Sequence, residues 1–158
     1  MSIAFSGEYP YIAPFLYVFD GEHLYFLSTK YGRKIELLKN NPYVAVEIEE
    51  FKPDLSSYKF VTLQGQIVEV TDPSEKERVR KMFADMIKEK GLSRKVLKAL
   101  GHSPEDPLAC LVKMERSYVW KLVDVVDITS IVENKPKKGG IPPTVLSHQV
   151  NNKIGPTC

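Results

Sequence analysis

Short apolar runs bounded by turn residues dominate the first part of the chain. Tyr11–Phe19 and His23–Ser28 are rich in aromatic and β-branched residues, and the Asp20-Gly21 pair between them is typical of a β-hairpin. Tyr43–Glu49 alternates apolar and polar positions, as a strand with one buried face does. The pattern therefore predicts three strands in this region.

Three further strand-like runs follow. Lys59–Val70 is long for a strand, and Gly65 in its middle predicts a bend that lets a sheet curl into a barrel. Ala109–Glu115 and Tyr118–Asp127 are expected to form another pair of strands. On the first of these, Cys110 is expected to point inward as a buried, unreactive thiol.

The apolar period changes to that of a helix at three places. Asp72 and Pro73 start the clearest helix, Gly91 ends it, and its apolar stripe is Val79, Met82, Phe83, Met86 and Ile87. A shorter helix is expected at Ser93–Leu100, before Gly101. A third begins in the polar turn Thr29-Lys30-Tyr31-Gly32-Arg33-Lys34 and stops before Pro42.

These elements together predict a mainly β chain with some α: a six- to seven-stranded antiparallel split β-barrel with short helices between the strands. Residues 1–132 are expected to form this barrel. Residues 133–158 hold 4 of the 11 prolines and 3 of the 9 glycines, so we expect a C-terminal extension, either an arm or disordered.

Composition narrows the class of protein. The 158 residues are 43% hydrophobic and carry a formal net charge of +2, which excludes a disordered chain and gives no basic stripe for nucleic acid. No apolar run is long enough to span a bilayer, and the first residues lack a secretory signal, so a cytoplasmic protein is expected. Cys110 and Cys158 give neither a disulfide framework nor metal-ligand spacing, so no metal is expected.

The polar turn before the third helix is the main candidate for chemistry. A helix N-terminus offers free N–H groups and a positive dipole end, and the side chains of Ser28, Thr29, Arg33 and Lys34 would complete a phosphate cradle there. The alternative is a solvated surface pair, because adjacent Arg and Lys are unfavourable for the dipole. The spacing alone leaves both interpretations open.

Residues 8–70 carry several short motifs in a fixed order: PYIAPFLY, YFLS, GRK, NNPYV, YKFV and GQIVEV. In this order and spacing they resemble the FMN-binding split-barrel superfamily of pyridoxamine 5′-phosphate oxidase-like proteins, particularly its nitroimidazole-resistance-like branch. Members usually carry an N-terminal helix and strand before the first motif, and we expect this fold to do without part of them.

The resemblance implies a homodimer with two FMN molecules at the subunit interface. The backbone of four residues would run along the isoalloxazine ring: Ala13, Pro14, Phe15 and Leu16. Leu27 and Ser28 would flank the ribityl phosphate, with Thr29 adjacent, and Arg33 and Lys34 would bind the phosphate. The ring would also be approached from the next long strand, of the other subunit, by Lys59, Phe60 and Val61.

The departures from the family limit the chemistry. Leu27 stands where the nitroimidazole-resistance-like branch often has His, and Phe60 where a small polar residue is usual. The substrate-binding Arg and His of pyridoxamine phosphate oxidases have no evident counterpart, so synthesis of pyridoxal phosphate is not expected. The resemblance implies a flavin-dependent oxidoreductase of unknown substrate; the alternative is a non-catalytic flavin-binding, carrier or sensor module. Single-stranded nucleic-acid binding is a third, less favoured alternative.

Two other groups of residues receive structural interpretations. Tyr118 and Trp120 share one strand face and are expected to pack in the core or a dimer interface. His102 follows Gly101 and is expected in a solvated loop or helix cap.

Overall fold

The computed structural model describes residues 1–134 and the strand at 144–149. The rest of the predicted C-terminal extension, 135–143 and 150–158, lies outside the described residues. The elements in chain order are β1 (Ser2–Phe5), β2 (Tyr11–Pro14), β3 (Tyr17–Phe19), β4 (Leu24–Thr29), α1 (Arg33–Asn40), β5 (Tyr43–Phe51), β6 (Ser57–Glu69), α2 (Pro73–Glu89), α3 (Val96–Ala99), α4 (Leu108–Lys113), β7 (Ser117–Asn134) and β8 (Thr144–Gln149).

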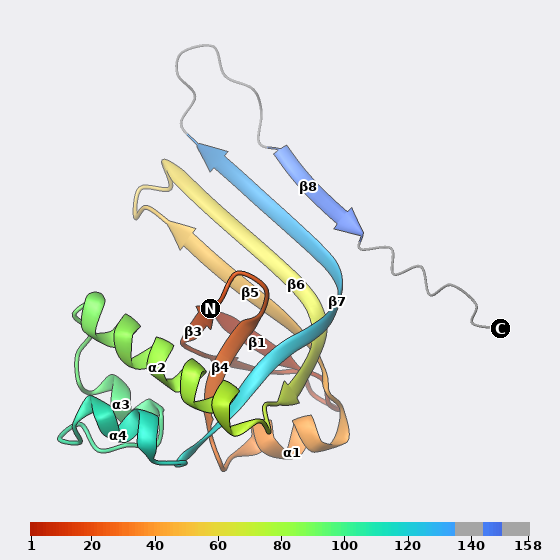
Figure 1. Ribbon diagram of the computed structural model, residues 1–158. Coiled ribbons are helices and arrows are strands. Elements are labelled where there is room, and N and C mark those ends of the chain that lie inside the picture. Colours follow the sequence, from red (N-terminus) through yellow and green to blue (C-terminus); the bar gives the residue numbers. More distant parts are fainter. Residues whose placement is uncertain (135–143, 150–158) are drawn as a thin grey trace.

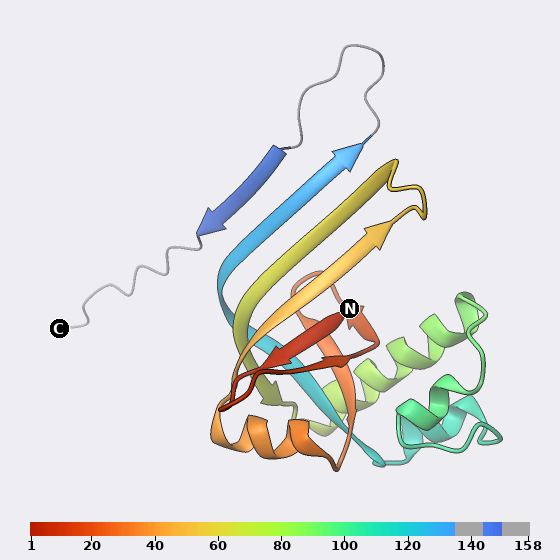
Figure 2. The ribbon, with the colours of Figure 1, turned by 180° about the vertical axis from the view of Figure 1, so that it is seen from behind.

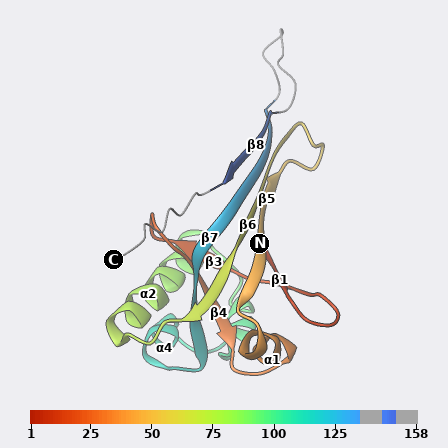
Figure 3. The ribbon, with the colours of Figure 1, turned by 90° about the vertical axis from the view of Figure 1, so that its right-hand side faces the viewer.

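The strands form one curled antiparallel sheet. Seven strands follow the order β2-β1-β5-β6-β7-β4-β3, and β8 pairs with β7 beside this path. The lower part curls around a core, while the upper parts of β5, β6 and β7 project beyond it (Figures 1 and 2). Figure 3 shows α2 and α4 on one side of the curled part and α1 near its lower end. The predicted mainly β, antiparallel split-barrel class is confirmed.

Gly65 marks the place where β6 bends. The register between β6 and β7 shifts between Gln64 and Gln66, which leaves an irregularity in the pairing. A Cβ at Gly65 would lie 2.7 Å from the carbonyl oxygen of Val123, so only glycine allows the two backbones to approach this closely. The bend predicted at Gly65 is confirmed.

Two apolar cores lie on the two faces of β4, since Leu24–Ser28 is buried throughout. The helix-side core packs the sheet against α2, α3 and α4 and includes Tyr25, Leu27, Phe83, Leu97, Leu100, Leu111 and Val119. The barrel core fills the curl and includes Ile3, Phe5, Phe26, Val46 and Trp120. The rings of Tyr118 and Trp120 stack with centroids 6.3 Å apart, so the predicted core packing of this pair is confirmed.

The helix at Pro73–Glu89 starts as predicted. The Asp72 side chain accepts a hydrogen bond from the Glu75 N–H, with Pro73 in the first turn. Its apolar stripe faces the helix-side core, where Val79 and Phe83 are fully buried. No helix in the described part of the chain is long and apolar enough to cross a membrane.

The strand predicted at Ala109–Glu115 is wrong, because most of this run forms α4. Short apolar runs cannot be assigned to strand or helix by periodicity alone. Leu111 is buried in the core, whereas Met114 is exposed and Cys110 is only partly buried, so the expected buried, inward-pointing thiol on a strand is also wrong. The run after it, expected to end at Asp127, continues as a strand to Asn134.

The predicted run Tyr11–Phe19 is divided into β2 and β3. Pro14 has no N–H to continue a ladder, and the chain leaves β1 at this point to pair β3 with β4. The sequence pattern did not predict β1. This strand lies between β2 and β5 and buries Ile3 and Phe5.

Candidate functional site

The turn between β4 and α1 has the features of an anion site. Gly32 takes φ +99° and precedes the helix, and no side chain caps the first turn. The Ile35 N–H donates to the Gly32 carbonyl oxygen at 3.0 Å, which leaves the N–H groups of Arg33 and Lys34 for water or for a bound anion. Ser28 is buried at the end of β4, and its hydroxyl donates a hydrogen bond to the Thr29 carbonyl oxygen at 3.0 Å.

Lys34 folds back over this turn. Its Nζ donates hydrogen bonds to Thr29 Oγ1 at 2.8 Å and to the Tyr31 carbonyl oxygen at 3.1 Å. Burial lowers the pKa of Lys34 from its ordinary value. Neither contact is with a carboxylate, so an anion at this place would find a half-buried cation that has no acidic partner among the described residues.

Arg33 lies on the solvent side of the same turn. Its guanidinium carbon is 5.7 Å from the centre of the Tyr11 ring, which is within the range of a cation–π contact. Arg33 is exposed and does not line the pocket described next. It is nevertheless adjacent to Lys34 and to Tyr11, which does line it.

A pocket of about 120 Å³ brings most of the predicted site residues together. Eight of the twelve predicted positions line it: Ala13, Pro14, Phe15, Leu16, Leu27, Ser28, Thr29 and Lys34. Sequence reasoning missed Tyr11, Ala99 and Leu100. Tyr11 lies two positions before Ala13 on β2, so strand parity could have found it. Nothing in the local sequence connects Ala99 or Leu100 with this place.

The other predicted ring contacts lie elsewhere in the chain. Lys59, Phe60 and Val61 belong to the projecting part of β6 and do not line the pocket. Phe60 packs on one sheet face between Tyr58 and Phe51, at ring distances of 5.4 and 6.4 Å. Within one subunit, these residues are not brought together with the polar turn.

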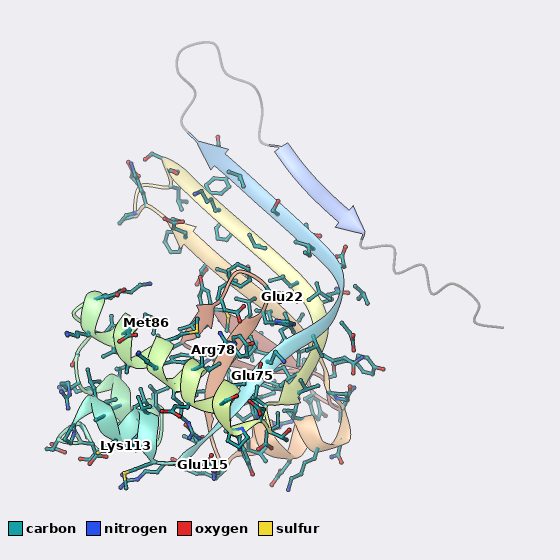
Figure 4. All side chains as sticks on the ribbon, viewed as in Figure 1. Glu22, Glu75, Arg78, Met86, Lys113 and Glu115 are labelled. Carbon is teal, nitrogen blue, oxygen red and sulfur yellow. The ribbon has the colours of Figure 1, made fainter. Side chains whose placement is uncertain are left out.

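A larger cavity of about 470 Å³ lies next to the pocket, between β3 and α2. Phe15 and Leu16 line both spaces. The α2 wall presents Met82 and Met86 together with two carboxylates, and Figure 4 marks Met86 toward the end of that helix. The cavity is therefore mainly apolar where it meets the pocket.

A polar cluster holds α2 against β4 and β7. Tyr25 Oη donates to Glu75 Oε1 at 2.8 Å and accepts from Arg78 at 3.0 Å, and Lys121 Nζ donates to the same Glu75 oxygen at 3.0 Å. Glu75 and Arg78 are labelled on α2 in Figure 4. Burial, together with the Glu75 hydrogen bond, raises the pKa of Tyr25 to about 12. These contacts stabilise the fold and lie outside the pocket.

A comparison with protein families gives one match, and a comparison with curated proteins gives none. A family model for pyridoxamine 5′-phosphate oxidase matches residues 1–109, more than two thirds of the chain. No curated protein sequence matches the chain.

Solved structures extend the likeness over the described fold. A pyridoxamine 5′-phosphate oxidase-related, FMN-binding protein from Nostoc punctiforme has a TM-score of 0.60 at 14% identity, covering 96% of this chain and 81% of its own. A FAD-binding protein from Mesorhizobium loti has a TM-score of 0.55 at 19% identity, covering 82% of both chains. A NimC/NimA family protein from Clostridium acetobutylicum has a TM-score of 0.53 at 17% identity, covering 93% of this chain and 82% of its own. At these identities the likeness concerns the fold.

Proposed function

This chain belongs to the pyridoxamine 5′-phosphate oxidase family, and on that premise we propose that it binds FMN and acts as a flavin-dependent oxidoreductase. Relatives of the same fold are described as FMN-binding and FAD-binding proteins. We also propose that the protein is a cytoplasmic homodimer. The substrate of the proposed enzyme is unknown.

One observation carries the proposal: the pocket joins a half-buried cation at a helix N-terminus to an apolar backbone segment. Lys34 and Ser28 stand at one part of it and the Ala13–Leu16 segment at another. A flavin mononucleotide needs both, because its phosphate requires an anion site and its ring an apolar slot with backbone hydrogen-bonding groups. Arg33 would add a second cation to the phosphate from the solvent side.

The size of the pocket supports a site shared by two subunits. Its volume of about 120 Å³ is well below the roughly 300–1,000 Å³ typical of ligand pockets. A second copy of the chain would supply the missing wall, with Lys59, Phe60 and Val61 of its projecting β6 approaching the ring. The exposed apolar side chains of that sheet, such as Phe51 at 52% and Ile131 at 38%, favour burial against a partner.

The phosphate site is tested by titrating FMN and riboflavin into the same proteins, since the two ligands differ only in the phosphate. Lys34→Met and Arg33→Ala should each weaken FMN binding roughly tenfold to a hundredfold, the effect of losing one charged hydrogen bond. Both variants should leave riboflavin affinity nearly unchanged. Lys39→Met, a matched change at the other end of α1, should affect neither ligand.

If wild-type protein binds neither flavin, the proposed function is wrong. If the two site variants lose FMN and riboflavin affinity equally, the pocket binds flavin but the phosphate lies elsewhere.

Rapid mixing separates an oxidoreductase from a passive flavin-binding module. The ring must be reachable by a donor and an acceptor, and the apolar cavity beside Phe15 and Leu16 would admit a flat, weakly polar molecule. Flavin bound to the enzyme should be reduced by NADH or NADPH and reoxidised by quinones or nitroaromatics faster than by oxygen. Reduction by dithionite alone, with no acceptor faster than oxygen, would favour the non-catalytic module.

A further inference from the structure

His102 lies at a helix end, as the cap alternative expected, but its ring is buried and makes no hydrogen bond to another described residue, unlike the solvated loop that was the other expectation. Its side chain is 0% exposed, and neither Nδ1 nor Nε2 has a hydrogen-bond partner among the described residues. Buried polar atoms are nearly always paired, so an imidazole in this state needs a physical explanation. The local sequence could not predict this burial, because tertiary packing and not the preceding Gly101 decides how exposed His102 is.

Charged groups surround this ring from three elements. Asp106, between α3 and α4, places Oδ2 at 3.6 Å from Nδ1, but that carboxylate already accepts from Arg116 at 3.0 Å and from the Ser103 N–H at 3.0 Å. Arg80 of α2 is nearly buried, with its charge partly balanced by Glu115 at 3.5 Å. Two cations, Arg80 and Arg116, therefore act on the imidazole against one carboxylate, Asp106.

The backbone of His102 is connected to the wall of the proposed flavin pocket through Gly101. Ala99 and Leu100 line that pocket, and the N–H of His102 closes the turn by donating to the Leu97 carbonyl oxygen at 2.9 Å. Gly101 takes φ +83° and packs so closely that a Cβ there would lie 3.1 Å from the Arg116 carbonyl oxygen. Because this turn is tightly packed and bonded, we expect a displacement of the His102 backbone to reach the wall that precedes it.

Protonation of His102 is unfavourable while the wall is packed. Burial lowers the pKa of His102, the charge of Arg116 lowers it further, and Asp106 only partly opposes them. A cation at this place would be paired only with Asp106, a carboxylate already shared with Arg116 and the Ser103 N–H, and it would be repelled by Arg80 and Arg116. The strain is relieved if the ring moves out to solvent, where an ordinary imidazole has a pKa of about 6.5.

We propose that His102 is a proton-sensitive positioning residue for the flavin pocket: the neutral ring keeps the wall of Ala99 and Leu100 packed, and proton uptake loosens the wall and releases the ligand. This inference rests on the proposed function, because it concerns the same pocket. If His102 acts in this way, the affinity of the pocket for its ligand depends on pH.

The direction of the effect follows from linkage. The imidazole has the lower pKa in the packed state, so the loosened state binds more protons below about pH 6.5. The packed wall is fully stabilised above that pH and loses stability as the pH falls through it. The loss can reach at most about tenfold per pH unit.

FMN affinity is measured at roughly pH 7.5 and roughly pH 5.5 in wild type, His102→Leu and His102→Gln, with His23→Gln as the control. The phosphate of FMN itself titrates at about pH 6. This ligand titration is the same in all four experiments, so comparing the proteins removes its effect on affinity. Wild type and the control should lose roughly threefold to tenfold more affinity on acidification than the two non-titrating variants. Equal losses in all four proteins would overturn the inference.

Two readouts keep the inference distinguishable from the proposed function. Hydrogen exchange at residues 97–102 of ligand-free wild type should speed up in acid beyond its intrinsic change, and this increase should be absent in His102→Leu. If FMN does not bind at all, the proposed function fails while this wall measurement still decides the inference.

NMR titration of the His102 ring in wild type needs no variant. A pKa below about 6.5 agrees with the inference, whereas a pKa at or above that value with an intact wall would contradict it.

Discussion

Lys34 is the residue on which the proposed phosphate site depends, and Thr29 orients it. The 2.8 Å bond from Lys34 Nζ to Thr29 Oγ1 holds the ammonium group over the turn. An oriented cation binds an anion better than a freely rotating one, because less side-chain entropy is lost on binding.

Thr29→Val keeps the shape of the side chain and removes that acceptor. We expect FMN affinity to fall roughly threefold to tenfold, the effect of one neutral hydrogen bond, with little change in thermal stability. Calorimetric titration checks the first quantity and thermal unfolding the second. An unchanged FMN affinity would mean that the Thr29 contact does not position the lysine.

Gly65 allows a second prediction at the scale of one residue. In Gly65→Ala the new methyl group meets the Val123 backbone at 2.7 Å, so the bend must shift at a cost of about 1–3 kcal/mol. In Gly7→Ala the methyl group meets the end of the Leu37 side chain at 2.6 Å, which can move, and the Tyr9 carbonyl oxygen at 3.5 Å, an ordinary contact. Melting temperatures should therefore fall by several degrees for Gly65→Ala and clearly less for Gly7→Ala. Equal decreases would show that the close backbone approach is not what requires glycine.

The site residues could be predicted from the sequence where one short segment contains all the residues of a feature. The polar turn with Ser28, Thr29 and Lys34 is such a segment, because a strand end and a helix start define it locally. Leu100 and His102 were not predictable, since Leu100 shares the helix-side core and the pocket with segments far away in the sequence, and charges from α2 and from the residue before β7 act on His102. Sequence patterns predict local features such as this turn, but they do not predict contacts that only tertiary packing creates.

Among the elements, the β3–β4 hairpin and α2 are joined by charges whose effect depends on pH. The His23 N–H donates to Asp20 at 2.8 Å, and Arg78 lies 3.0 Å from the same carboxylate. The His23 hydrogen bond is the main cause that holds the pKa of Asp20 well below its usual range, against the opposing effect of burial. The carboxylate therefore stabilises the fold above about pH 4, and this stabilisation is lost as the pH falls below that value.

Asp20→Asn keeps a side-chain oxygen for the turn N–H groups but loses the ion pair. We expect the variant to be somewhat less stable at neutral pH and to lose stability less steeply than wild type between about pH 4 and about pH 2. Urea unfolding across that range measures the slope. Asp85→Asn, at an exposed position of α2, serves as control, and identical slopes in all three proteins would refute the assignment to Asp20.

Elements with a strong period and a defined start were predictable, and short apolar runs were not. The Asp72 cap and the apolar stripe of α2 are a signal that only a helix satisfies. The run around Leu111 has too few residues to distinguish the two periods, and Pro107 before it allowed a helix start that was overlooked. The N-terminal strand has only Ile3 and Phe5 on its buried face, which is too little pattern to detect.

At the scale of the whole molecule, β8 is the described part of the C-terminal region, and it adds to the projecting sheet. β8 pairs with β7 between Asp127 and Val132, away from the curled part of the sheet. The sequence predicted an arm or a disordered extension after Val132, and the placement of Ile141 lies outside the described residues.

Truncation after Val132 should leave a folded core that still binds FMN. Every side chain that the structure describes in the helix-side and barrel cores comes before that point, so the melting temperature should change by a few degrees at most. Thermal unfolding and FMN titration of the truncated chain check this. A large fall in stability, or loss of FMN, would show instead that Ile141, Val145 and Leu146 dock as an arm across a dimer.

The central claim is that two copies of the chain complete one kind of flavin site, and native mass spectrometry of the FMN-saturated protein tests it most directly. We predict a species of about twice the 18.0 kDa chain mass that carries two FMN molecules, and loss of FMN whenever the dimer dissociates. A monomer that retains FMN tightly would contradict the claim, because the small pocket of one subunit would then hold the cofactor without a partner.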